Sequence, residues 1–468
     1  MAEWQRARLI PTSGIRSTAE AEARATSSFL AVLGVVRPLS KALLSPFGAS
    51  RAERAEVEAY IEVPFKSASG KIVRPDGLLR VHYGSQKPWA ALVEVKTGGN
   101  LLAAEQINEY WDIARAQGFD SVITISNEIA PAPGVHPTGG LKLRSNSRVS
   151  VHHLSWTLIL AEAMKQKVHR GVADPEQAWL LGELIRYLEH PSSGAMEFDD
   201  MGPNWALVRD AAHQSRLSRR DPAVVEIAQR WDQLMRYASI RLGSETGSDV
   251  QELVAKREQG DPSARVRHLV DGLCSNGVFD GALRVPDAAG DINVSVDLRA
   301  RRIRVWTEIA APDDRGARAR VTWLVRQLAD APAGARLESL AKNARVPEAA
   351  DLAAVVNDPT LLVTGDKRDP VRFRIAVQSP MGTNRKVGKS PGFVESVLSA
   401  ITAYYERVLQ PITPYQRRAP QRKLGDGGLP EPLSDEPVEP SEAFPADHRD
   451  QRSRAESDSW DSDRPLSL

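Results

Sequence analysis

Residues 72–99 read IVRPDGLLRVHYGSQKPWAALVEVKTGG, two apolar runs that are joined by the stretch Gly-Ser-Gln-Lys-Pro. Glycine and proline in that stretch are typical of a turn, so the runs predict two neighbouring strands, 72–83 and 89–96. Alternate side chains of a strand point to opposite faces, which places Glu94 and Lys96 on the same face. A carboxylate and an ammonium at the end of an apolar strand are costly unless they are paired or bind a ligand. This strand end is therefore the first candidate for a functional site.

Asp76 adds a second carboxylate from the strand that precedes Glu94 along the chain. If the two strands form a hairpin, its carboxylate lies beside that of Glu94. Two convergent carboxylates suit an oxygen-liganded cation such as Mg²⁺ or Mn²⁺, which can activate a bound water and stabilise charge on a phosphoryl oxygen. Lys96 could orient the water or offset the developing charge. Two simpler interpretations stay open, because Pro-Asp-Gly is a good turn tripeptide and Glu94 with Lys96 could be an ion pair on a solvated strand edge.

The elements around these two strands follow a regular order. Ser17 with Glu20 three residues later forms a capping box, which predicts a helix that runs to about Ser45. Alternating apolar and polar residues over 56–65 predict a strand. The other predicted elements are a helix over 101–117, a buried strand over 119–126, a strand over 148–154 and a helix to about 169. The order is αβββαβ, followed by a further strand and helix.

Asp76, Glu94 and Lys96, on these elements, resemble the signature of the PD-(D/E)xK nuclease superfamily, whose core has the same αβββαβ order. The resemblance implies a restriction-endonuclease-like fold in which the aspartate and the glutamate bind Mg²⁺ or Mn²⁺ and the lysine is their catalytic partner. It also implies hydrolysis of phosphodiester bonds, in DNA more often than in RNA. Gln106 and Tyr110 lie four residues apart on the following helix and resemble the Q-x-x-x-Y motif of the RecB-like branch, in which both residues line the active site.

Glu22 is a further candidate because of its position on the first predicted helix. It is in line with Thr26, Phe29 and Leu33, which form the stripe expected to face the sheet. Many members of the superfamily carry a glutamate on this helix as an additional metal ligand, so the resemblance implies that role for Glu22. For Glu20, the capping box is already a sufficient explanation.

Changes in composition along the 468 residues predict several domains. We predict a nuclease-like domain over 1–170, a helical domain over 171–261, an α/β domain over 262–412 and a disordered tail over 413–468, where apolar residues become sparse. Lys and Arg (61) nearly balance Asp and Glu (60), so any nucleic-acid-binding surface must be local. The single cysteine, Cys274, excludes an internal disulfide and a cysteine-based zinc site.

Compartment and membrane association can also be predicted from the apolar runs. The N-terminus lacks the apolar core of a signal peptide. The longest apolar run, 29–36, is far shorter than the roughly 20 residues that cross a bilayer. We therefore expect a cytoplasmic protein that has no membrane partner.

Three functional hypotheses follow. The first is a Mg²⁺- or Mn²⁺-dependent nuclease that acts on DNA. The second is a catalytically silent, nuclease-like scaffold that binds nucleic acid or a protein partner in a stress or defence response. As a whole, the chain resembles poorly characterised actinobacterial proteins that are labelled as stress-response proteins. The third is a structural or interaction protein in which the motif is accidental.

The helical and C-terminal domains could contribute a protein-binding surface or substrate contacts. Basic residues cluster at 299–304 and at 367–389, and such clusters could bind phosphates without sequence preference. The alternative is a solvated sheet face in a protein that is rich in arginine.

Overall fold

The computed structural model describes residues 7–50, 54–132, 134–144, 147–342, 344, 346–363, 369–385 and 391–416. They belong to one compact unit, Met1–Arg417, whereas the second unit, Arg418–Leu468, lies outside them. The predicted disordered tail, 413–468, therefore lies almost entirely outside the described residues. Helices and sheets are both present, which confirms the mixed α/β class.

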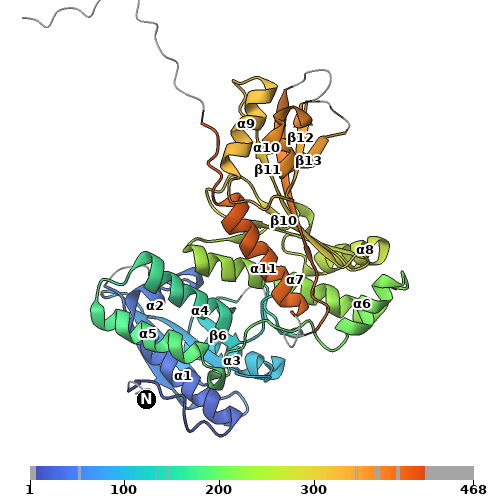
Figure 1. Ribbon diagram of the computed structural model, residues 1–468. Coiled ribbons are helices and arrows are strands. Elements are labelled where there is room, and N and C mark those ends of the chain that lie inside the picture. Colours follow the sequence, from blue (N-terminus) through green and yellow to red (C-terminus); the bar gives the residue numbers. More distant parts are fainter. Residues whose placement is uncertain are drawn as a thin grey trace, which may run out of the picture. The chain divides into compact units, whose positions relative to one another are not determined.

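The first sheet contains the predicted functional strands (Figure 1). In spatial order its strands are β1 (Glu56–Ile61), β4 (Gly77–His82), β5 (Trp89–Val95), β6 (Ser121–Ser126) and β7 (Ser150–Ser155). β1, β4 and β5 are antiparallel neighbours, and β6 and β7 continue the sheet parallel to β5. Nearly every residue of β5 and β6 is buried, because helices cover both faces of the sheet.

Two hydrophobic cores lie on the two faces of this sheet. The helices on one face are α1 (Thr18–Val35), α2 (Arg37–Leu44), α4 (Trp156–Met164) and α5 (Pro175–Glu189). The other face is covered by α3 (Ala104–Gln117), which contributes Tyr110 and Trp111. On α1 the predicted stripe is buried, since Thr26, Phe29 and Leu33 all face the sheet core or its edge.

The helix predicted over 17–45 is two helices, with a bend of 105° between α1 and the segment that follows. Pro38 explains the break, because proline has no N–H for the preceding turn and favours the first turn of a new helix. Of the described helices, none alone is long and apolar enough to cross a membrane, and α1 with α2 meets that criterion only as a bent pair. The cytoplasmic location stays a prediction.

The strand predicted over 72–83 is also interrupted. Its first residues form β3 (Ile72–Val73), which pairs with β2 (Phe65–Lys66) in a separate two-stranded sheet, and β4 begins only at Gly77. Pro75 cannot donate a hydrogen bond to a neighbouring strand, which explains the gap. Asp76 therefore lies immediately before β4, and not within a strand as predicted.

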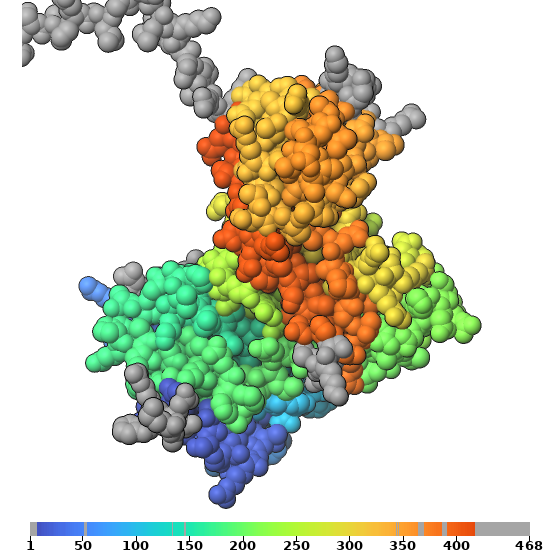
Figure 2. Space-filling model, in the orientation of Figure 1, coloured from blue at the N-terminus to red at the C-terminus, as the bar shows by residue number. Residues whose placement is uncertain are grey.

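The second sheet has seven antiparallel strands. In spatial order they are β13 (Glu348–Asp351), β12 (Arg336–Ala341), β14 (Pro370–Pro380), β11 (Arg302–Ala310), β10 (Ile292–Asp297), β9 (Val278–Arg284) and β8 (Gln251–Glu252). Its core is built with α7 (Pro222–Thr246), α8 (Pro262–Asn276), α9 (Ala317–Gln327), α10 (Leu352–Asn357) and α11 (Phe393–Tyr404). Figure 2 shows the orange-red surface of α11 beside the yellow-green surface of α7.

The segment predicted as a helical domain, 171–261, is divided between the two cores. Leu181 and Leu184 of α5 are buried in the core of the first sheet. In contrast, α6 (Trp205–His213) and α7 bury Trp205 and Trp231 in the core of the second sheet. Each helix buries its apolar stripe against the nearest sheet, so this segment has no core of its own.

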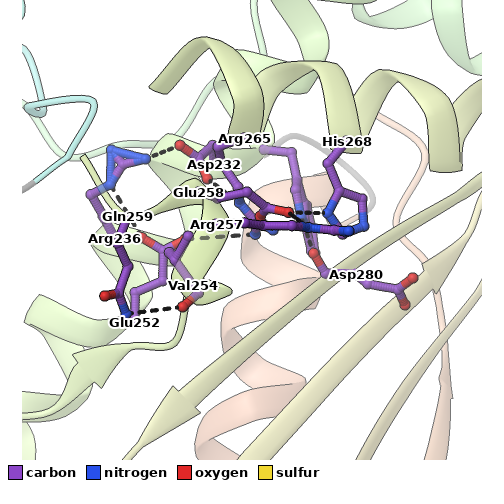
Figure 3. Close-up of polar contacts among 11 residues, drawn as sticks. Asp232, Arg236, Glu252, Val254, Arg257, Glu258, Gln259, Arg265, His268 and Asp280 are labelled. Atoms are coloured by element: carbon purple, nitrogen blue, oxygen red, sulfur yellow. Dashed lines mark hydrogen bonds and ion pairs between the residues drawn. The ribbon is translucent and has the colours of Figure 1, made fainter. Parts of the chain in front are cut away.

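A cluster of buried charges lies where α7, α8 and β8 meet (Figure 3). Asp232 binds Arg236 and also accepts a hydrogen bond from Nε of Arg265 at 3.0 Å. Glu252 lies 3.2 Å from Arg236, and Glu258 lies 3.4 Å from Arg265. Arg236 also donates to the carbonyl oxygen of Ala130, in the loop after β6. The cluster therefore ties α7 to the first sheet.

Candidate active site

The predicted metal ligands meet the predicted lysine where β4 begins and β5 ends. Nζ of Lys96 lies 2.6 Å from Oε1 of Glu94 and 3.2 Å from Oε1 of Glu22, and it donates to the Val95 carbonyl oxygen at 3.1 Å. Oδ2 of Asp76 accepts a hydrogen bond from the Val95 N–H at 2.7 Å. Two carboxylates thus contact the ammonium group, and the carboxylate of Asp76 lies beside them at the end of β5.

The register of β4 explains how Asp76 reaches this point. Gly77 pairs with Val93, so the residue before it lies beside Glu94 at the end of β5. Glycine at 77 allows close packing, because a Cβ there would lie 2.5 Å from Cδ1 of Leu30 and 3.3 Å from Cβ of Val93 and would force the buried Leu30 side chain to move. Pro-Asp-Gly is therefore more than a turn signal: it brings the carboxylate to the edge of the packed core.

Glu22 contacts the segment after β5 as well as Lys96. Its Oε2 accepts hydrogen bonds from the Thr97 N–H and from Nδ2 of Asn100, each at 3.4 Å. Asn100 was not among the predicted site residues. Asn100 contacts Glu22 because residues 97–100 turn back towards α1. No local sequence pattern indicates this turn.

Gln106 and Tyr110 approach the carboxylates from α3. Nε2 of Gln106 donates to the Tyr110 hydroxyl at 2.9 Å, as their spacing on one helix face allows. Tyr110 is only 2% exposed, and its hydroxyl is close enough to Glu94 for each group to shift the pKa of the other. All six predicted site residues therefore gather in one place.

The electrostatics of the site are dominated by burial. Glu94 is 1% exposed, and burial, with the charge of Asp76, raises its pKa to about 7, while Lys96 acts in the opposite direction. Burial also raises the pKa of Asp76, although the Val95 N–H offsets part of this effect. For Lys96, burial favours the neutral amine, but the neighbouring carboxylates outweigh it and raise the pKa. The ammonium is therefore the stable form of Lys96.

The carboxylate oxygens fit a hard divalent cation in chemical type. Oε2 of Glu94 is buried and has no hydrogen-bond partner of good geometry among the described residues, although the Tyr110 hydroxyl lies near it. The geometry is not that of a ready ligand cage. Within the described part of the chain, no three Asp, Glu, His or Cys residues are arranged around a common point as metal ligands would be. The Lys96 ammonium lies between Glu94 and Glu22.

A row of polar residues continues from Glu94 across the sheet. Thr124 of β6 is the register partner of Glu94, and His153 of β7 is the register partner of Thr124. Oγ1 of Thr124 lies 2.7 Å from Nε2 of His136 and 2.9 Å from Nδ1 of His153. The sequence analysis did not identify this row, because Thr124 lies in an apolar strand and the parallel pairing of β5, β6 and β7 is not evident from local patterns.

The partners of the two imidazoles determine where their protons lie. A carbonyl oxygen can only accept, so Nε2 of His153 donates to the Glu128 carbonyl at 2.8 Å, and Nδ1 accepts from the Thr124 hydroxyl. Nδ1 of His136 accepts from the Thr138 N–H at 3.0 Å, so its Nε2 donates to Thr124. Both rings are neutral in this chain of hydrogen bonds, and burial lowers the pKa of each to about 4.

We expect His153→Gln to flatten the loss of stability that the protein shows in acid. The unfolded chain binds protons at His136 and His153 below about pH 6.5, whereas the folded chain does so only near pH 4. Stability that is present above pH 6.5 is therefore lost as the pH falls towards 4. Glutamine keeps a donor and an acceptor but does not titrate. Thermal unfolding between pH 7 and 4.5 tests this, with His213→Gln, at an exposed position, as the control. Equal slopes for His153→Gln and the wild type would contradict the prediction.

The arginines predicted as phosphate contacts in the C-terminal block are partly engaged within the protein. Arg374 bridges Glu308 and Glu338 across β11, β14 and β12, and Arg372 binds Glu308 at 3.1 Å. Arg304 binds Glu338 at 3.1 Å. This part of the sheet face therefore matches the alternative of a solvated, ion-paired surface. Of the remaining predicted basic positions, Arg385 binds Asp200 at 3.0 Å and Arg302 donates to Gln378. Lys367, Arg368, Lys386 and Lys389 lie outside the described residues.

Comparison with known proteins adds no assignment. No known protein family, no curated protein and no solved structure matches the chain.

Proposed function

We propose that the protein is a metal-dependent nuclease that hydrolyses phosphodiester bonds, with DNA as the substrate. The observation that carries the proposal is the pairing of Glu22 and Glu94 with the Lys96 ammonium, with Asp76 held beside Glu94 by the Val95 N–H. A carboxylate as deeply buried as Glu94 is a poor choice for stability alone, because burial disfavours its charged form. Groups whose pKa is strongly shifted by burial and by charged neighbours cluster at functional sites.

The arrangement of elements supports the same proposal. α1 is followed by β1, β4 and β5 as an antiparallel group, and then by α3 and the parallel strand β6. This order agrees with the αβββαβ core that the PD-(D/E)xK resemblance implies. We therefore propose a restriction-endonuclease-like core for the first sheet and its helices, with the site at the junction of β4 and β5.

In this proposal Asp76 and Glu94, with Glu22, hold Mg²⁺ or Mn²⁺. When bound, the cation would supply positive charge to the phosphoryl oxygens and promote attack by water. Lys96 keeps its proton and places a positive charge and hydrogen-bond donors where negative charge develops. The Tyr110 hydroxyl remains protonated, because burial and Glu94 raise its pKa, so it acts as a donor that orients a carboxylate or the substrate.

The alternative function is a silent scaffold that binds nucleic acid or a protein partner. One observation favours it: the Lys96 ammonium already pairs with Glu94 and Glu22 and offsets part of their charge without a cation. Such a scaffold would bind its partner equally well after chelation. An active enzyme would need the lysine to move away from at least one carboxylate when a cation binds.

We expect purified protein to cleave DNA with Mg²⁺ or Mn²⁺ and to lose this activity after chelation. Asp76→Asn keeps the shape of the side chain but removes its charge, and should lower the cleavage rate at least about 100-fold. The measurement is cleavage of labelled single-stranded and double-stranded DNA and RNA. Asp112→Asn is the matched control, because Asp112 forms an exposed ion pair with Arg115 on α3.

Cleavage that survived both chelation and Asp76→Asn would exclude the proposed site. Metal-independent binding of nucleic acid without cleavage would favour the scaffold.

A further inference from the structure

A cavity of about 590 Å³ lies between α2, the end of β4 and the segment that precedes α5. Much of its lining is apolar, including Leu44, Val57, Val81 and Val172. Its volume is in the range of small-molecule sites, roughly 300–1,000 Å³. None of the predicted site residues lines it. The cavity therefore belongs to neither the proposed active site nor its approach.

Two cations on α2, Arg37 and Lys41, lie at this cavity. Arg37 and Lys41 are one helical turn apart and both exposed, so their charges repel each other. Neither forms an ion pair with any residue that the structure describes. The acidic residue in the lining, Asp174, caps α5 and accepts hydrogen bonds from the N–H groups of Glu176 and Gln177. Its charge still offsets part of that of Arg37, but the lining keeps an excess of positive charge.

Arg170 brings a third positive charge to the cavity lining. Its guanidinium lies 3.1 Å from Glu162 and 3.8 Å from Asp249, and the side chain is 43% exposed. It lies at the end of a π-helical turn, Lys165–Arg170, and such turns often occur at functional sites. The lining thus holds three cations and one carboxylate around an apolar hollow.

We propose that this cavity binds an organic anion: a phosphate or carboxylate group at Arg37, Lys41 and Arg170, with an apolar body against Val57 and Val81. A mostly apolar pocket with a few converging polar groups is the usual form of a small-molecule site. An inorganic anion would contact the cations but would not displace water from the apolar part of the lining. The apolar body should therefore contribute much of the affinity.

The site is independent of the proposed nuclease function. Val81 and Asp76 lie at opposite ends of β4, five residues apart, which is about 17 Å along a strand. Substitution of Asp76 should therefore leave anion binding unchanged.

The test is calorimetric titration of the full chain at low salt with three probes: inorganic phosphate, adenosine 5′-monophosphate and octanoate. We expect at least one organic probe to bind ten times more tightly than inorganic phosphate. Preference for the nucleotide would identify the head group as phosphate, and preference for octanoate would identify it as carboxylate. Organic probes that bind no more tightly than inorganic phosphate would overturn the proposal.

Two substitutions locate the binding. Lys41→Glu, which reverses a charge at the cavity, and Ala42→Phe, which adds bulk to its lining, should each weaken binding at least tenfold. Lys71→Glu, at an exposed position beside β3, and Asp76→Asn should not change it. Thermal unfolding of each variant checks that it folds. Affinities within twofold of the wild type for both cavity variants would overturn the proposal, even if a probe binds elsewhere.

Discussion

Glu94→Gln is expected to lower metal-dependent cleavage at least about 100-fold while removing a pH-dependent loss of stability from the metal-free protein. The loss of activity follows because glutamine cannot supply the charge that a hard cation requires. This change has the largest effect that we expect on activity, since Glu94 is the most deeply buried of the predicted site residues.

The stability effect has a sign that can be worked out. The pKa of Glu94 is raised from 4.5 to about 7 in the folded chain, chiefly by burial. Between these values the folded chain holds a proton that the unfolded chain has released, so the free energy of unfolding falls as the pH rises from about 4.5 to 7. Glutamine resembles the protonated acid at every pH. The variant should therefore lack this decline. Relative to the wild type, its free energy of unfolding should be highest above pH 7.

Cleavage assays with Mg²⁺ and thermal unfolding in chelator, both from pH 5 to 8, measure the two effects. Glu245→Gln, which removes an exposed ion pair on α7 with Arg241, is the control for a glutamate far from full burial. Wild-type activity in Glu94→Gln would refute its role as a ligand. A parallel decline of stability with pH in variant and wild type would refute the raised pKa.

Asp232→Ala is expected to lower the free energy of unfolding by about 3–5 kcal/mol, the usual cost of removing one partner from a buried ion pair. Asp232 is 3% exposed and binds both Arg236 and Arg265 (Figure 3). Without it, the two guanidinium groups repel each other, and the acidic partners that remain to them are Glu252 and Glu258.

Denaturant unfolding measures this loss, and Asp271→Ala is the matched control. Asp271 binds Arg219 in a pair whose side chains are both about 60% exposed, and exposed pairs contribute little. Hydrogen exchange in the loop after β6 gives a second measurement, because Arg236 also binds the Ala130 carbonyl oxygen there. Equal stability of the two variants would show that the buried cluster contributes no more than a surface pair.

Local patterns were sufficient for much of the first sheet. Period-two alternation and buried apolar runs predicted β1, β5, β6 and β7 to within a few residues, because such strands differ from helices in the spacing of their apolar residues. The same spacing predicted that Glu94 and Lys96 share a face, and their side chains lie 2.6 Å apart. Gln106 and Tyr110 likewise follow from helix geometry alone.

Other features could not be predicted because they depend on packing between distant segments. The break at Pro38 divides the first helix, and the gap at Pro75 separates β3 from β4, yet the sequence analysis treated each as one continuous element. The helical segment 171–261 has periodic apolar residues. This periodicity predicts an apolar face on each helix, but not the sheet against which that face packs. Its helices are shared between two cores for that reason.

The sequence by itself determined which residue types share a face or a turn: Glu94 with Lys96 on a strand, Gln106 with Tyr110 on a helix, and Asp76 before its glycine. These relations extend over a few residues and depend only on backbone geometry. Tertiary structure alone decided that Glu22 reaches Lys96 across 74 residues, and that Thr124 and His153 extend the row from Glu94. It also decided the protonation of the site, because a pKa depends on burial and on charges brought together from separate elements.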